Sequence, residues 1–64
     1  MPAEVQDIEE FVRISERASE CRVKRGEGWV KLKLRTPKRL YTIKVDEDIA
    51  EELIKRVKCP VREL

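Results

Sequence analysis

Histidine is absent from this 64-residue sequence, so the side chain that most often serves as a general base or a metal ligand is missing. The two cysteines, Cys21 and Cys59, are too few for a four-ligand zinc site. Ser15 and Ser19 lie in a charged stretch without a base or acid that would activate them. We therefore expect neither an enzyme nor a metal site.

Long hydrophobic runs are also missing. No run of about 18 apolar residues is available to span a bilayer, and residues 1–10 are too acidic for a signal peptide. These features predict a cytoplasmic protein. A chain of 64 residues with 41% hydrophobic side chains can bury one small core, so we expect a single domain over residues 1–64.

Uncharged amide side chains are scarce, because asparagine is absent and Gln6 is the only glutamine. Charged residues make up 44% of the chain, a composition typical of heat-adapted, thermophilic proteins. The cysteines then have two interpretations. They are small buried hydrophobes with free thiols, which we favour, or they form a disulfide, which hyperthermophile cytosols tolerate.

Two amphipathic helices are predicted from apolar side chains that recur three or four residues apart. The first covers residues 7–18, with Asp7 as its N-cap. The second follows Asp46, carries acids in its first half and bases in its last, and is ended by Pro60.

Between these helices the apolar pattern alternates with a period of two, which predicts three strands near residues 21–24, 30–35 and 40–45. Residues 61–64 are extended and add a possible short fourth strand at an edge. We predict an α+β fold in the order α-β-β-β-α: a three-stranded antiparallel meander with both helices packed on one face.

The register of the meander follows because inward side chains must meet inward side chains. Pairing Leu34 with Tyr41 puts Lys31 opposite Lys44, and a four-residue loop in the first hairpin puts Lys24 opposite Lys31. These three lysines are then expected to form a row across the exposed face, on which we expect no acid. Like charges that face each other destabilise a sheet, and a bound polyanion would reverse the sign of that effect.

Charge is strongly polarised along the chain. Nine bases and one acid in residues 21–44 give +8, and six bases and twelve acids elsewhere give −6, which together recover the net charge of +2. This pattern indicates a phosphate-binding sheet. The candidate RNA-binding residues are Arg22, Lys24, Arg25, Lys31, Lys33, Arg35, Lys38, Arg39 and Lys44. The alternative is that lysine and arginine only decorate exposed strands and protect edges from aggregation.

Two aromatic residues need separate interpretations. Trp29, at the mouth of the first turn, either stacks on a base or belongs to the rim of the core, and we favour the rim because one aromatic side chain does not make a stacking platform. Tyr41 follows the inward parity, so we expect it in the core with its hydroxyl at the edge.

Several segments together resemble a known family. They are the start MPxE followed by residues 7–12, the runs 31–35 and 39–43, the helical segment 50–53 and the ending 61–64. In this order they are similar to the large-ribosomal-subunit protein thirty-eight family of eukaryotes and some archaea. The resemblance implies a structural protein of the large subunit that binds ribosomal RNA and neighbouring ribosomal proteins, without catalysis or cofactor.

Two other functions remain open from the residues alone. A protein-interaction module would use the acidic helix faces, with Glu9, Glu16, Glu51 and Glu52, to engage a basic neighbour. A DNA-compacting chromatin protein would use the same basic sheet on duplex DNA. No membrane and no small-molecule substrate are expected as partners.

Overall fold

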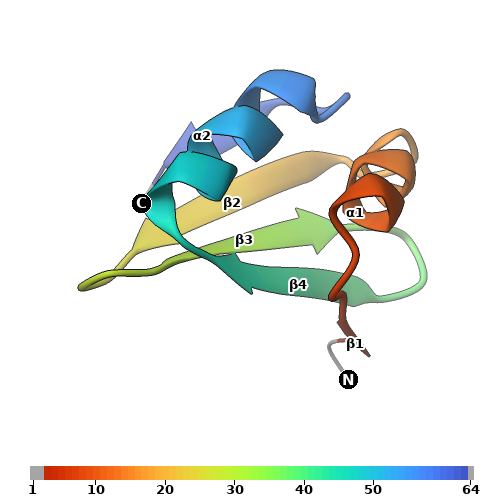
Figure 1. The fold of residues 1–64 in the computed structure, drawn as a ribbon. Helices are drawn as coiled ribbons and strands as arrows, with labels where there is room; N and C mark the ends of the chain where they lie inside the picture. Colours follow the sequence, from red (N-terminus) through yellow and green to blue (C-terminus); the bar gives the residue numbers. More distant parts are fainter. Residues whose placement is uncertain (1–2, 64) are drawn as a thin grey trace.

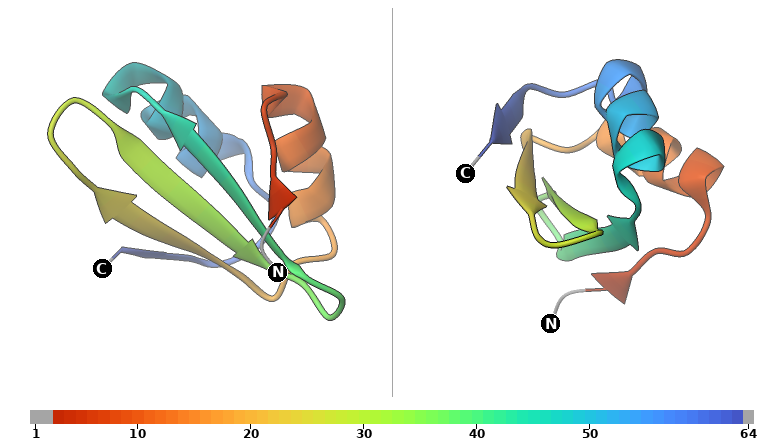
Figure 2. Two further views of the ribbon diagram at one scale, coloured as in Figure 1. Left: turned by 90° about the horizontal axis from the view of Figure 1, so that it is seen from below. Right: turned by 60° about the vertical axis from the view of Figure 1, so that its left-hand side comes forward.

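The architecture is a mixed five-stranded sheet with both helices on the same face (Figure 1). The computed structural model describes residues 3–63. Its elements are β1 (Ala3–Glu4), α1 (Ile8–Ser15), β2 (Glu20–Arg25), β3 (Val30–Arg35), β4 (Leu40–Val45), α2 (Glu47–Arg56) and β5 (Val61–Glu63). The strand order is β1-β4-β3-β2-β5. Viewed from below, β2, β3 and β4 lie in front of the helices, and no helix of the described residues covers this second face (Figure 2).

The sheet confirms the α+β class and the central antiparallel strands, but it is not purely antiparallel. At one edge β1 pairs in parallel with β4, and at the other β5 pairs in parallel with β2. The two-residue β1 was not predicted because it is too short to show an alternating pattern. The fourth strand expected in residues 61–64 is β5, which ends at Glu63; Leu64 lies outside the described residues.

The central register agrees with the sequence prediction. Leu34 pairs with Tyr41, while Lys31 pairs with Lys24 on one side and Lys44 on the other. Alternation therefore holds the apolar side chains of three strands on the helix side and the lysines on the opposite side.

Helix α1 begins as expected, because the Asp7 carboxylate Oδ1 accepts a hydrogen bond from the Glu9 N–H at 2.9 Å. It ends at Ser15, and the predicted end at residue 18 is wrong. The N–H groups of residues 16–18 donate to carbonyls three residues back, at 3.2, 3.1 and 3.2 Å. This tighter bonding is typical of a frayed last turn.

Helix α2 is capped by Asp46, whose Oδ1 accepts from the Ile49 N–H at 2.9 Å. The helix ends at Arg56, because Val57 is already extended, with φ −63° and ψ 147°. The chain therefore leaves the helix before Pro60, which was expected to end it.

The core lies between the sheet and the two helices, where removal of apolar surface from water stabilises the fold. Tyr41 is half-buried against this core, as expected. The buried hydrophobic side chains are Val5, Phe11, Ile14, Cys21, Val23, Val30, Leu32, Leu34, Ile43, Ala50 and Leu53.

Both cysteines are free, in agreement with the interpretation that we favoured. Cys21 is fully buried in β2, and burial, followed by the nearby Cys59, raises the pKa of its thiol to about 12. Burial also raises the pKa of Cys59, which is half-buried. The Cys21 thiol is therefore protonated at neutral pH.

Ser15 joins α1 to the segment that leads into β5. Its side chain is fully buried; the Oγ donates to the Val12 carbonyl and accepts from the Lys58 N–H at 3.0 Å. The three-and-four spacing of the first helix placed Ser15 among its apolar positions, but the sequence did not predict these hydrogen bonds.

No helix within residues 3–63 is long and apolar enough to cross a membrane. In the same described part of the chain, no three histidine, cysteine, aspartate or glutamate side chains are grouped so that they could hold a metal ion.

Candidate nucleic-acid interface

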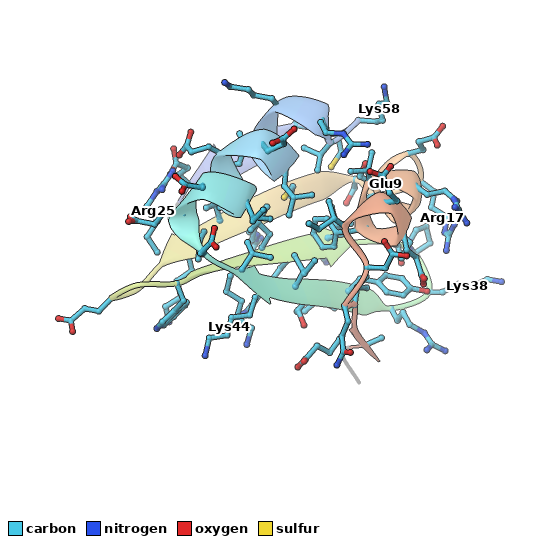
Figure 3. All side chains as sticks on the ribbon, viewed as in Figure 1. Glu9, Arg17, Arg25, Lys38, Lys44 and Lys58 are labelled. Atoms are coloured by element: carbon cyan, nitrogen blue, oxygen red, sulfur yellow. The ribbon has the colours of Figure 1, made fainter. Side chains whose placement is uncertain are left out.

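The side of the sheet opposite the helices carries most of the predicted basic residues. They alternate with buried strand residues and so point away from the core. Lys44, for example, projects below the sheet, on the side away from the helices (Figure 3). We call this surface the basic face and define it by Arg22, Lys24, Lys31, Lys33, Arg35, Lys44 and Arg62.

Strand pairing arranges these cations in two rows. The first contains Lys24, Lys31 and Lys44, as predicted. The second contains Arg62, Arg22 and Lys33, in that order across β5, β2 and β3. Sequence reasoning missed Arg62, because the partner of the expected edge strand was not assigned.

A hollow lies at one end of the basic face. It encloses about 290 Å³ and is lined by Arg22, Lys33, Arg35 and Leu40. Arginine can form two parallel hydrogen bonds with a phosphate, and lysine supplies a compact charge. The hollow therefore has the donors and positive charge that suit a phosphate group.

The expectation that this face carries no acid is wrong. By register, Glu20 in β2 and Glu4 in β1 both lie on it. Arg22 forms an ion pair with Glu20, and its hydrogen bond lowers the pKa of that carboxyl. Glu4 lies beside Thr42, on the β4 side of the sheet. The positive charge is therefore concentrated over β2 and β3.

Arg25 lies apart from the basic face. Its Nε donates to Glu63 Oε1 at 2.8 Å and its Nη2 donates to Glu51 Oε1 at 3.0 Å. These hydrogen bonds raise the pKa of Arg25. The side chain joins β2 to β5 and α2 on the helix side (Figure 3). Its parity in the strand, the same as that of Cys21 and Val23, was a signal for this position.

Lys38 and Arg39 lie in the exposed turn between β3 and β4. The Thr36 hydroxyl fixes this turn by donating to the Arg39 carbonyl at 2.6 Å and accepting from its N–H at 3.2 Å. A second hollow of about 400 Å³ is lined by Arg17, Thr36, Pro37, Lys38 and Tyr41. Arg17, which the sequence analysis did not select, therefore adds a third cation at this end of the sheet (Figure 3).

Trp29 is the residue before β3, and its ring lies on the outward side of the sheet, beside the outward side chain of Lys44. The Lys44 Nζ is 5.2 Å from the centroid of its ring. Among residues 3–63, the hydrophobic side chains that pack against the core do not include Trp29. The interpretation of Trp29 as part of the core rim is therefore wrong.

The opposite side of the molecule is acidic. Arg56 bridges the two helices by donating to both carboxylate oxygens of Glu9, at 2.7 and 2.9 Å, and this contact lowers the pKa of Glu9. A groove of about 610 Å³ runs beside the bridge. It is lined by Gln6, Asp7, Ile8, Glu9, Ile49, Glu52 and Arg56.

A cationic sheet face backed by an acidic helix layer is typical of small proteins that bind the phosphates of nucleic acids. The model of the ribosomal L38e protein family matches residues 1–60, and the chain belongs to this family. It is 47% identical over 64 residues to the large ribosomal subunit protein eL38 of Aeropyrum pernix, an alignment that covers all of this chain and 96% of that protein. The chain is thus a ribosomal protein, and its location is the cytoplasmic ribosome.

Proposed function

We propose that this ribosomal protein is a structural, non-catalytic component of the large ribosomal subunit, and that its basic face binds ribosomal RNA. The observation that carries the proposal is the pair of cation rows, in which like charges face each other across neighbouring strands. Each such pair destabilises the free sheet by a few tenths to about 1 kcal/mol. RNA phosphates over the rows turn this repulsion into attraction.

The contacts divide between two kinds of cation. The lysine row supplies point charges, while Arg22 and Arg35 at the hollow supply paired donors for one phosphate. To bind it, Arg22 exchanges the Glu20 carboxylate for phosphate. Phosphate contacts fix position and carry little sequence information, so the fold of the RNA supplies the specificity.

Lys38, Arg39 and Arg17 extend the proposed contact beyond the sheet at the β3–β4 turn. Arg25 stays with Glu51 and Glu63 and supports the edge of the sheet from behind. The single domain over residues 1–64 thus presents one RNA-binding surface.

The helix layer is the proposed contact for neighbouring ribosomal proteins. Its groove combines the apolar side chains Ile8 and Ile49 with the carboxylates of Asp7, Glu9 and Glu52, which would repel phosphate and attract a basic protein segment. In assembled subunits, we expect crosslinks to RNA from the basic face and crosslinks to protein from the helix layer.

The salt dependence of RNA binding tests the proposal. If Lys24, Lys31, Lys33 and Lys44 each neutralise one phosphate, log affinity against log salt has a slope of roughly −3 to −4, at about 0.7 to 0.9 per phosphate. The double variant Lys31→Glu/Lys33→Glu should flatten the slope by about two units. A matched control, Lys55→Glu/Lys58→Glu, makes the same change in net charge on the exposed helix side and should leave the slope almost unchanged.

Equal effects of the two double variants would contradict binding by the basic face. Equal retention on duplex DNA and on large-subunit RNA in direct competition would instead favour the chromatin alternative. In a sucrose gradient of native lysate, the protein should sediment with large subunits; its presence mainly in the soluble fractions would contradict the ribosomal role.

A further inference from the structure

We infer that Trp29 and Lys44 form a subsite for one unpaired RNA base at the β2–β3 hairpin end of the basic face. This inference rests on the proposed RNA binding and adds a contact to a base. The indole ring is the stacking surface, and Lys44 covers it in the free protein.

The position of the ring suits contact with a base. Trp29 is the last residue of the loop before β3, and its ring lies beside Lys44, which points outward from β4. A nucleic-acid backbone bound along the lysine row would therefore bring its bases within reach of the indole.

The loop backbone supports the ring. The Gly26 N–H donates to the Trp29 carbonyl at 2.9 Å, and Gly28 has a φ of 75°, a conformation that glycine adopts without strain. A Cβ at Gly26 would lie 2.2 Å from Trp29 Cε2 and Cζ2. The ring thus rests directly against the Gly26 backbone, which only glycine permits, and the loop holds it in a defined orientation.

The contact that covers the ring is weak. The Lys44 ammonium lies 5.2 Å from the ring centroid and belongs to an exposed side chain. An exposed cation–π contact is weaker than stacking of a base on an aromatic ring. When Lys44 turns to a phosphate, the ring becomes available to the neighbouring base. This exchange accounts for a half-buried tryptophan that lies among cations and does not pack against the core.

The test uses the fact that Trp29 is the only tryptophan, so indole fluorescence reports on this subsite alone. The probes are a short single-stranded oligoadenylate and inorganic polyphosphate, which offers phosphates without bases. Oligoadenylate should quench the fluorescence strongly, because a base stacks on the ring. Polyphosphate should bind and displace Lys44 with only a small change in fluorescence.

Affinity measurements separate a stacking role from a structural one. Trp29→Leu should weaken oligoadenylate binding about 5- to 150-fold and leave polyphosphate binding unchanged. Trp29→Phe, which keeps an aromatic ring, should restore part of the affinity. Far-UV circular dichroism establishes that both variants fold.

The failures of the two proposals are distinguishable. Equal quenching by both probes, or an unchanged oligoadenylate affinity for Trp29→Leu, would overturn the stacking subsite while leaving binding by the basic face intact. If the wild-type protein showed no salt-dependent binding to either probe, the proposed function itself would be overturned.

Discussion

Lys31 is the residue at which stability and the proposed function conflict most directly. It faces Lys24 in β2 and Lys44 in β4, so two like charges lie opposite it. Lys31 is also half-buried. The free protein therefore carries a repulsion that RNA binding would relieve.

We expect Lys31→Glu to raise the free energy of unfolding, because it replaces two repulsive pairs by two attractive ones, each a few tenths to about 1 kcal/mol. Urea unfolding followed by circular dichroism measures the effect. Lys31→Gln, which removes the repulsion without adding attraction, should fall between the wild type and Lys31→Glu. A loss of stability in both variants would show that packing of the lysine stem outweighs its charge.

Side-chain parity predicted the lysine row, since a period of two fixes which side chains point outward. Parity also indicated that Arg25 points to the helix side. Its partners Glu51 and Glu63 belong to elements distant in sequence, so no local pattern predicted these ion pairs. The position of Trp29 was predicted wrongly for a similar reason. Its ring packs against the Gly26 backbone, and this contact depends on the loop conformation, which the alternating pattern does not show.

Short strands that pair in parallel with their neighbours form both edges of the sheet. The antiparallel centre was predictable because neighbouring strands are joined by tight turns, which set the register. The parallel edges were not, since β1 pairs with β4 and β5 with β2 across long stretches of sequence. Their attachment depends on a few specific contacts, such as Ser15 with the Lys58 N–H.

Ser15→Ala should lower the free energy of unfolding by about 1 to 3 kcal/mol, because the Lys58 N–H loses its partner in a partly buried site. The Cys21 N–H, which donates to the Pro60 carbonyl at 2.8 Å, should then exchange faster with deuterium. Urea unfolding and amide exchange measure the two effects.

Ser19→Ala is the matched control, because the Ser19 Oγ makes an exposed hydrogen bond at 3.2 Å and its backbone N–H still donates to Arg35. We expect it to change stability by less than about 0.5 kcal/mol. Equal losses for the two serine variants would mean that Ser15 does not hold β5 in place.

The whole molecule is electrostatically two-sided, with the basic face on the sheet and the acidic layer on the helices. Glu9 of α1 and Arg56 of α2 hold the helices together through two hydrogen bonds between the guanidinium and the carboxylate. Arg56 lowers the pKa of Glu9, and Arg22 lowers that of Glu20, each chiefly through a hydrogen bond. Both carboxylates therefore favour the folded state when they are ionised.

Stability should consequently depend on pH on the acid side. Because the folded pKa values of Glu9 and Glu20 lie below the unfolded value of 4.5, their contribution is present above pH 4.5 and is lost as the pH falls through the lowered values. Glu9→Gln should make this loss shallower, as measured by thermal unfolding between about pH 2 and 6.

Glu27→Gln, in the exposed β2–β3 loop, is the control and should retain the slope of the wild type. Added salt should reduce the difference between Glu9→Gln and the wild type, since exposed pairs are screened. An unchanged acid slope in Glu9→Gln would show that the bridge between the helices does not contribute to stability.

The placement of β5 also matters during synthesis. Among the described elements, β5 leaves the ribosome last, so the outer edge of β2 stays unpaired until every other strand and helix has been made. Open edges of this kind recruit strands from other chains. In β2, however, three of the last four residues are cations, Arg22, Lys24 and Arg25, and their charges make two nascent copies repel. Arg22 and Lys24, for which we propose RNA contacts, thus also help to protect the unfinished protein from pairing with itself.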